Sequence, residues 1–361
     1  MFGILIREKG KGGFKNIGDF VQSIAQRQFL LNKELCYVDI ENLSIFENEE
    51  KVNVIMNGWF MHNPKAFPPS DSINPLFISF HLTPPAEKDF FTPQTIEYLK
   101  KYEPIGTRDF LTAEIMQRHG IKAYMSGCLT LTLGKQYGGQ NHNGDYIIVD
   151  PYIEVGGDLN YCRSKKMLKT LFFCLKNFRK TMLLQKRYLG HDVFSHYHLP
   201  KCVQRFMEAA TFYELYSKRF SDEILLNAVY KTVIVDDDLS IEKKFGIADS
   251  LLKEYAKAKL VITSRLHVSF PCLAMNTRNI FVMPSKKNEE KDVMRYRGRL
   301  ERLEDVVTVL ELKDGAIVNS NDKLPQFITP QNFPDNKDGF VRFRDDLSEK
   351  VMQFVSKNSV V

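Results

Sequence analysis

Short apolar segments alternate along this chain with longer segments whose apolar residues recur every three or four positions. The short runs have the length of buried strands, and the longer segments have the period of helices that cover a sheet. In the first part of the chain, the predicted strands are residues 2–6, 52–56, 77–80 and 121–125, and the predicted helices are residues 20–31, 92–101 and 108–119. This alternation is typical of an α/β fold built on a parallel sheet.

The pattern restarts after residues 135–144, a polar and glycine-rich segment without periodicity. Further strands are predicted at 146–149, 233–235, 260–263 and 279–283, with helices at 201–218, 221–230 and 247–257. The charged segment 286–302 predicts a loop, the chain after residue 315 reads as irregular, and a last amphipathic helix is expected at about 345–354. We therefore predict an N-terminal domain at 1–137, a C-terminal domain at 144–315 and a tail at 316–361. Two such halves would enclose a cleft between the carboxyl ends of their sheets, where α/β folds bind ligands.

Composition narrows the classes of function. Hydrophobic residues make up 43% of the chain and aromatic residues 12%, which argues against a disordered protein. No apolar stretch reaches the roughly 20 residues that span a bilayer, and the short apolar start does not resemble a secretory signal. Six cysteines without a C-x-x-C pair suggest reduced thiols, so we expect a cytoplasmic protein, soluble or peripheral on the membrane. The net charge of +6 favours an anionic partner, although no nucleic-acid-binding motif and no metal-ligand spacing is found.

The strongest local signal runs from Lys259 to His267, where a buried strand ends and a helix begins. Arg265 and His267 would occupy the turn between them, beside the free N–H groups and the positive dipole end of the helix. An arginine there binds phosphate or carboxylate through two donors, and a histidine transfers protons near neutral pH. An Arg-x-His pair taken alone is more often structural than catalytic, but its location at the end of the strand favours a functional role.

A second signal, Lys15-Asn-Ile-Gly-Asp19, lies between the first strand and the first helix. Its glycine allows a close approach of the backbone to a ligand, but the spacing matches neither a dinucleotide-binding motif nor a P-loop. Asp19 is either a base that activates a hydroxyl or the N-cap of the helix that follows. Two hypotheses are therefore open for this carboxylate.

Three other positions could face the cleft. Arg108 could project into it, or it could pair with Asp109 at a helix start. Asn57 and Trp59 follow a buried strand, and the indole ring could stack on a sugar or belong to the core. His81, after the strand predicted at 77–80, could likewise face the cleft or belong to the core.

Together these motifs resemble the polysaccharide pyruvyl transferase family. The resemblance rests on N-I-G-D at 16–19, G-T-R-D at 106–109, S-G-C-L-T-L-T-L at 126–133 and A-K-L-V-I-T-S-R-L-H at 258–267, and it covers roughly residues 3–310. It implies two Rossmann-like domains facing across a cleft, as in GT-B glycosyltransferases. It also implies phosphoenolpyruvate as donor, a sugar diol as acceptor, and a cyclic pyruvate ketal and free phosphate as products, with no metal or other cofactor.

On the family's pattern, Arg265 and His267 fall in the Arg-Leu-His donor site, together with Ser264 and Leu266. The residues suit this chemistry: we expect His267 to be the acid or proton shuttle, Asp19 the base, and Arg265 and Arg108 the electrostatic partners of the donor. The remaining candidate substrate-binding residues are Asn16, Gly18, Asn57, Trp59 and His81. This chain departs from the family's pattern at one position. Some relatives carry an arginine where it has Asp150-Pro151-Tyr152, and the nearest basic residue is Arg163. The second cation that would hold the donor phosphate is therefore left open.

Residues 163–187 contain nine Lys or Arg and no acidic residue, with apolar residues at helical intervals. This segment is either an amphipathic helix packed on the core or an interfacial helix that docks on anionic lipid, which would suit a lipid-linked acceptor.

Two functions other than pyruvyl transfer remain open. One is a nucleotide-sugar glycosyltransferase, for which Asp236, Asp237 and Asp238 are possible ribose ligands. The other is a non-catalytic peripheral protein that binds anionic lipid or glycan.

Overall fold

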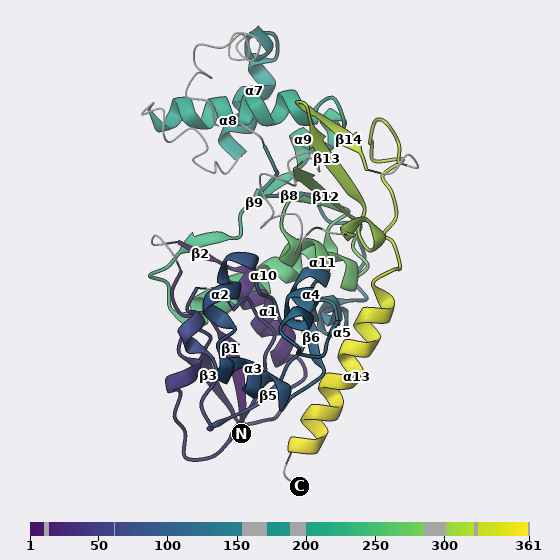
Figure 1. The fold of residues 1–361 in the computed structure, drawn as a ribbon. Helices are drawn as coiled ribbons and strands as arrows, with labels where there is room; N and C mark the ends of the chain where they lie inside the picture. The colour runs from purple at the N-terminus through teal and green to yellow at the C-terminus, as the bar shows by residue number, and fades with distance from the viewer. Residues whose placement is uncertain are drawn as a thin grey trace.

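The computed structural model describes residues 1–10, 14–60, 62–153, 172–187, 200–284, 300, 302–320 and 324–359, and every structural statement below refers to these residues. Parallel sheets covered by helices confirm the predicted α/β class (Figure 1). We call residues 1–137 the N-terminal half and residues from 144 onward the C-terminal half. Within the described part of the chain, no helix combines the length and the hydropathy that a membrane span requires.

The N-terminal half is built on a parallel sheet in the order β3-β1-β4-β5. Its strands are β1 (Phe2–Ile6), β3 (Leu35–Asp39), β4 (Val52–Ile55) and β5 (Ile73–Leu76). Every residue of β1 and β4 is buried, which explains why both strands are continuous apolar runs. Next to β5, a second parallel pair consists of β6 (Ile105–Thr107) and β7 (Ala123–Met125). The N–H of Phe80 donates to the carbonyl of Gly106, which links the two groups of strands.

The C-terminal half contains a six-stranded sheet in the order β14-β13-β12-β11-β8-β9. Its strands are β8 (Tyr146–Val149), β9 (Val229–Lys231), β11 (Leu260–Thr263), β12 (Asn279–Pro284), β13 (Val309–Lys313) and β14 (Ala316–Asn319). All pairings are parallel except the β13–β14 hairpin, which turns at Asp314 and Gly315, both with positive φ.

Helices cover these sheets. They are α1 (Gly18–Arg27), α2 (Glu87–Phe90), α3 (Pro93–Lys100), α4 (Phe110–Arg118), α5 (Gly134–Tyr137), α7 (Phe178–Arg187), α8 (Lys201–Tyr216), α9 (Asp222–Asn227), α10 (Ile241–Lys257), α11 (Leu266–Ala274) and α13 (Val341–Asn358). Each predicted helix overlaps one of these. The helix predicted at 345–354 is longer at both ends.

Three local predictions were wrong. The strand predicted at 77–80 lies at β5 instead, because Ser79 has a positive φ of 54° that ends regular pairing. The helix predicted at 221–230 ends at Asn227, and the chain continues as β9. β14 lies where an irregular chain was expected, since its mixed polar pattern carries a weak strand signal. The loop predicted at 286–302 falls mainly outside the described residues.

Hydrophobic clusters join the two halves. Phe20 on α1 meets Phe245 on α10 edge to face, with ring centroids 4.9 Å apart, and both belong to a cluster that also contains Val268 of α11. A short strand of the N-terminal half, β2 (Phe14–Asn16), pairs antiparallel with β10 (Ile234–Asp236) of the C-terminal half. The cluster and the strand pair hold α1 and α11 in a fixed relation.

The last helix returns to the N-terminal half. In Figure 1, α13 runs from the C-terminal half down along the side of the N-terminal half. Its residues Leu347 and Val351 are completely buried in the shared cluster, which also contains Leu129 and Leu133. The core of the N-terminal half is therefore completed by a segment from the far end of the sequence.

The contact between α5 and α11 can be tested at Gly134. A Cβ atom at this position would lie 2.0 Å from the backbone oxygen of Ala274, so Gly134→Ala requires a backbone shift and should cost about 1–3 kcal/mol of unfolding free energy. Gly246, inside α10, has no atom within 4 Å of such a Cβ. Gly246→Ala should therefore stabilise the protein by about 0.5–1 kcal/mol. Urea unfolding of both variants measures the difference, and equal midpoints would contradict the α5–α11 packing.

Candidate active site

A cleft of about 600 Å³ lies between the two halves. It is lined by residues that directly follow strands, among them Arg7 after β1, Arg108 after β6, and Ser264 and Arg265 after β11. The carboxyl ends of strands from both sheets therefore meet at one site, as the sequence pattern predicts for this fold class. Of the candidate residues named from the sequence, those that line the cleft are Asn16, Gly18, Asp19, Trp59, Arg108, Ser264, Arg265, Leu266 and His267.

Arg265 is held in place by a buried carboxylate. Its Nε atom donates to Oδ2 of Asp150 at 2.9 Å, and this oxygen also accepts the N–H of Val233 at 3.2 Å. The Ser264 hydroxyl donates to the backbone oxygen of Asp150 at 2.7 Å, which fixes the turn in front of α11. Asp150 is 2% exposed. At the position where some relatives of the resembled family carry a cation, this chain thus has an anion that orients Arg265; Arg163 lies outside the described residues.

The terminal nitrogen atoms of Arg265 remain for a ligand. The structure gives them no hydrogen-bond partner in the described part of the chain, and the side chain is 33% exposed at the cleft. Arg265 is also the N-cap residue of α11, so the N–H groups of the first helical turn, which have no partner within the helix, follow it directly in the chain. The positive charge of Arg265, the dipole of α11 and the two parallel N–H donors that a guanidinium offers all favour an anion at this position.

His267 contacts Arg108 across the cleft. Nη1 of Arg108 lies 3.2 Å from Nε2 of His267 and donates to Oε1 of Gln22 at 2.9 Å. Because a guanidinium can only donate, a hydrogen bond at this contact requires Nε2 to be the acceptor. Arg108 is 8% exposed, so its charge is positioned before any substrate binds.

The absence of a side chain at Gly18 lets α1 and α11 meet at their N-terminal ends. A Cβ atom on Gly18 would lie 3.0 Å from Nδ1 and 3.2 Å from Cβ of His267. Oδ1 of Asn16 would also be 3.0 Å away, so an added Cβ would require Asn16 or His267 to shift by a few tenths of an ångström. Two helix N-termini, one from each half, therefore point their positive dipole ends toward the same cleft.

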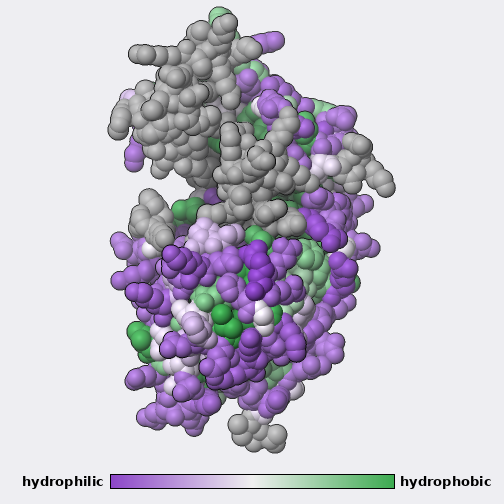
Figure 2. All heavy atoms as spheres, in the orientation of Figure 1, coloured by the Kyte–Doolittle hydropathy of each residue, from purple (hydrophilic) through white to green (hydrophobic). Residues whose placement is uncertain are grey.

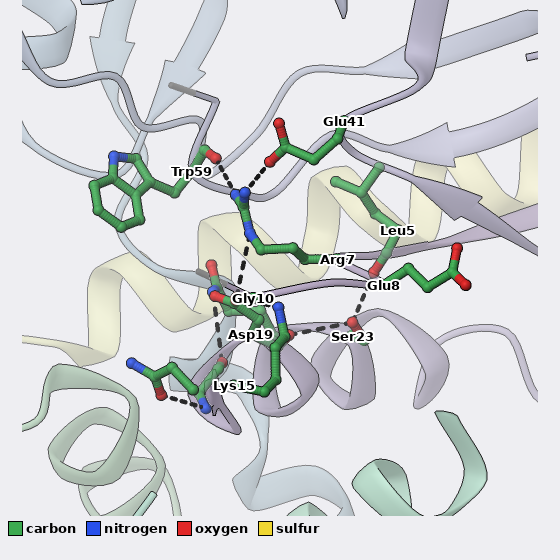
Figure 3. Close-up of polar contacts among 12 residues, drawn as sticks. Leu5, Arg7, Glu8, Gly10, Lys15, Asp19, Ser23, Glu41 and Trp59 are labelled. Atoms are coloured by element: carbon green, nitrogen blue, oxygen red, sulfur yellow. Dashed lines mark hydrogen bonds and ion pairs between the residues drawn. The ribbon is translucent and has the colours of Figure 1, made fainter. Parts of the chain in front are cut away.

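Asp19 belongs to a network of buried charges, which Figure 3 shows around Arg7. Its Oδ2 atom accepts from Nζ of Lys15 at 2.9 Å and lies 3.3 Å from Nε of Arg7. Arg7 in turn contacts Glu41 and donates to the backbone oxygen of Trp59 at 2.6 Å. The Lys15 side chain is 1% exposed, so the carboxylate compensates a cation that has lost its contact with water.

These contacts set the acidity of the network. Burial alone would raise the pKa of Asp19, but Lys15 and Arg7 outweigh it, and the pKa lies below its usual value. Burial lowers the pKa of the Lys15 ammonium, and Asp19 offsets only part of this effect. As the side chains are placed here, Asp19 is an ionised and weak base.

The alternative in which Asp19 caps α1 was wrong. The N-cap residue is Ile17, which makes no side-chain cap, and Asp19 lies inside the first turn. Asn16 makes the local turn instead, because its Oδ1 accepts the N–H of Gly18 at 2.8 Å. Asp109, in contrast, caps α4 by accepting the N–H of Thr112 at 2.8 Å, and this leaves Arg108 to the cleft.

Trp59 is half-buried at the edge of the cleft, with its ring centroid 4.9 Å from that of His62. His81 and Asn57 lie behind this edge and do not line the cleft. His81 is fully buried and its Nδ1 lies 2.5 Å from Oδ2 of Asp109. Asn57 is 2% exposed, accepts from Gln26 and donates to the backbone oxygen of Gln22 at 3.3 Å. Both side chains thus support the walls of the site.

Sequence reasoning missed several residues of the cleft. They are Arg7, Lys15, Gln22, Glu41 and His62. Arg7 follows the first buried strand directly, which is the same signal that identified Arg265, and Lys15 opens the second motif. Gln22 and Glu41 carry no such signal, because only the packing of α1 and the turn after β3 bring them to the site.

Cations outnumber carboxylates on the described cleft wall. Arg7, Lys9, Lys15, Arg108 and Arg265 line it, against Asp19 and Glu41. A cleft with this balance and low-dielectric walls concentrates small anions. It suits a ligand that carries more than one negative charge.

Comparison with known proteins gives one match. A family model described as polysaccharide pyruvyl transferase matches residues 16–286, which include both sides of the cleft. No curated protein matches the chain.

The Asp19 network predicts a pH-dependent stability. Asp19→Asn removes the counter-charge of two buried cations, so the free energy of unfolding at pH 7 should fall by about 2–3 kcal/mol. The native pKa of Asp19 is lowered, so its contribution is present above its unfolded pKa of about 4 and is lost as the pH falls through the native value. Urea unfolding from pH 7 to pH 3 should therefore show the parent and the variant converging at the acid end.

A matched control is Asp346→Asn. Asp346 pairs with Lys350 on the surface and is 41% exposed, so its loss should change the unfolding free energy by less than about 1 kcal/mol. A difference between parent and Asp19→Asn that stays constant down to pH 3 would show that the carboxylate charge is not its source.

Proposed function

Because the chain belongs to the polysaccharide pyruvyl transferase family, we propose that it transfers pyruvate from phosphoenolpyruvate to two hydroxyls of a sugar, forming a cyclic ketal. The observation that carries the proposal is the cationic cleft in which Arg265 and His267 stand at the N-terminus of α11. Phosphoenolpyruvate is a small ligand with a phosphate and a carboxylate, and both groups match guanidinium donors. The reaction would serve the biosynthesis of a surface polysaccharide, such as a capsule or an exopolysaccharide.

The proposed arrangement is that of GT-B glycosyltransferases. The two halves would be Rossmann-like domains at 1–137 and 144–315, with the acceptor on the first and the donor on the second. Support comes from the parallel sheets whose carboxyl ends border the same cleft.

Arg265 and the first turn of α11 would bind the phosphate of the donor. Arg108 would bind its carboxylate, since it lies across the cleft and is anchored by Gln22. Lys15 and Arg7 are the candidates for the second phosphate cation, in place of the arginine that some relatives carry. A phosphate bound to these two cations would weaken their attraction for the Asp19 carboxylate. The pKa of Asp19 would then rise, and Asp19 would become a stronger base.

The reaction needs two additions at the same carbon. The first hydroxyl attacks C2 of the enol as the C3 methylene takes a proton and becomes a methyl group. The second hydroxyl then displaces phosphate from C2, and its proton ends on the departing phosphate. One C–O bond is lost and two are formed, which gives the ketal and inorganic phosphate without a redox step. No metal or other cofactor is needed for this sequence.

His267 would act as the proton shuttle. Its neutral imidazole has a lone pair on Nε2, which takes the proton of the first hydroxyl when Arg108 turns to the donor carboxylate. The imidazolium then delivers that proton to the methylene. Asp19 would take the proton of the second hydroxyl.

The acceptor sugar would stack on Trp59 at the edge of the cleft. The indole is half-buried beside His62 and offers a flat apolar surface of the kind that sugar rings contact. A lipid-linked acceptor and a cytoplasmic setting belong to the same proposal. The free thiols of Cys36, Cys128, Cys174, Cys202 and Cys272 suit a reducing compartment.

A nucleotide sugar is the main competing donor. The three consecutive aspartates considered as ribose ligands do not line the cleft in the described structure. Asp237 instead accepts the N–H of Gly10 at 2.8 Å and lies 3.3 Å from Nζ of Lys244.

A thermal-shift comparison tests the donor. Phosphoenolpyruvate should raise the melting temperature of the parent, and nucleotide sugars should not. Arg265→Ala should abolish the shift, because it removes the guanidinium next to the α11 N-terminus. Arg278→Ala is a matched control, since Arg278 pairs with Asp335 on the surface and should leave the shift unchanged. Stabilisation by a nucleotide sugar alone would replace the proposed donor.

Loss of the imidazole tests the shuttle. His267→Gln should lower the rate of phosphate release by about 10²–10⁴ at saturating phosphoenolpyruvate and acceptor, with donor binding retained in the thermal shift. His119→Gln is the control, since His119 lies near Glu87, far from the cleft residues in the fold. A folded His267→Gln enzyme with the parent rate would rule out the assigned role.

A further inference from the structure

The outward side of α7 and of the helical residues just before it exposes large apolar side chains. Phe172 is 71% exposed, Leu175 66%, Phe178 53% and Leu183 38%. Aromatic and leucine side chains gathered on one helix are unusual on a surface that meets only water. The opposite side of the same helix is well packed, with Cys174 and Leu184 buried against α8. Phe178 also contacts Phe206 of α8, with ring centroids 6.3 Å apart, but more than half of its surface stays exposed.

Cations alternate with these apolar residues. Lys176, Arg179 and Lys186 are exposed on the outward side, and residues 172–187 contain no Asp or Glu. Lys180 differs, since its Nζ atom binds Asp222 at 2.6 Å. The start of α8 adds Lys201, Val203 and Arg205, all exposed, to the same end of the molecule. We call these exposed residues of 172–187 and of the start of α8 the apolar–cationic face of α7 and α8.

The apolar–cationic face lies at one end of the described structure. In Figure 1, α7 and α8 stand beyond the six-stranded sheet, at the opposite end from both termini. Figure 2 shows that the visible face of the N-terminal half is mainly hydrophilic, with apolar residues scattered among polar ones. Among the described residues, 172–187 carry four of the exposed large apolar side chains, whereas those of the N-terminal half, such as Leu31 and Ile45, are far apart in the sequence.

Charge complementarity identifies the occupant. Side chains of Phe and Leu insert at the boundary between lipid head groups and acyl chains, while Lys and Arg extend to anionic head groups. A second copy of this chain would bring two cationic faces together, and residues 172–187 contain no acidic group that could compensate the charge of the other copy, which is unfavourable. An anionic bilayer satisfies both kinds of side chain at once.

We propose that the apolar–cationic face of α7 and α8 binds the surface of an anionic lipid bilayer. The proposal does not depend on pyruvyl transfer. Residues 163–171, which the sequence pattern assigns to the same basic stretch, lie outside the described residues and are not part of the argument.

Flotation of the full chain with vesicles tests the proposal. The chain should float with vesicles of phosphatidylcholine and phosphatidylglycerol, and much less with phosphatidylcholine alone. Raising the salt concentration should weaken this binding. The triple variant K176Q/R179Q/K186Q should lower the partition coefficient roughly 100-fold, since each cation near an anionic surface contributes about fivefold. The double variant F172S/L175S should also lower it, including at high salt.

Matched controls are available on the N-terminal half. K88Q/K100Q/K101Q removes three exposed cations from α2, α3 and the residue after α3, and L31S/I45S removes two apolar residues that are 70% and 73% exposed. Both controls should bind like the parent. Circular dichroism and the urea midpoint confirm that each variant is folded.

Two results would overturn the proposal. One is the absence of flotation with anionic vesicles, or flotation that the α7 variants and the controls change equally. The other is a dimer in light scattering that F172S/L175S dissociates, which would assign the face to a second copy of the chain. The phosphoenolpyruvate-induced thermal shift is a separate readout, so failure of either proposal can be recognised alone.

Discussion

The meeting of α1 and α11 at their N-terminal ends is the constraint on which the site depends. Gly18 favours this meeting, because a Cβ atom there would lie only 3.0 Å from Nδ1 of His267. The shared core around Phe20 and Phe245 holds the two helices in that relation. The position of Arg108 against His267 and the convergence of two helix dipoles follow from it. Backbone geometry thus makes the cleft favourable for an anion before any charged side chain is considered.

The charged side chains then refine this geometry through internal ion pairs. Asp150 orients Arg265 by its Nε atom and leaves the terminal nitrogens for a ligand, while Asp19 holds Lys15 and Arg7. Each carboxylate reduces the net attraction for an anion. In return, each cation is fixed in direction and does not have to be ordered when the ligand arrives. On the proposed function, a phosphate would compete with Asp19 for its cations, which couples donor binding to the strength of the base.

Much of this fold could be predicted, because buried parallel strands and amphipathic helices have distinct periods. Because α/β folds bind ligands at the carboxyl ends of their parallel strands, Arg265 and Arg108 could be predicted to lie at the cleft. It could not separate Trp59, at the cleft edge, from His81 directly behind it, since both follow strands and differ only in tertiary burial. Gln22 was missed because a glutamine inside a helix has no local signal. β5 was misplaced because Pro75 and Asn74 interrupt its apolar run, and Asn74 is accommodated by a hydrogen bond to Asn53.

The return of α13 to the N-terminal half also has a consequence for synthesis. As the chain leaves the ribosome, the first sheet and α1 are produced long before Leu347 and Val351, which complete their core. Contacts of such high sequence separation are slow to form, and the uncovered apolar surface must wait for them. The cluster that α13 shares with β1 and α1 therefore closes only after α13 has been synthesised, whereas the second core of the N-terminal half, around Val54 and Phe80, is formed entirely by residues 5–121 and can assemble earlier.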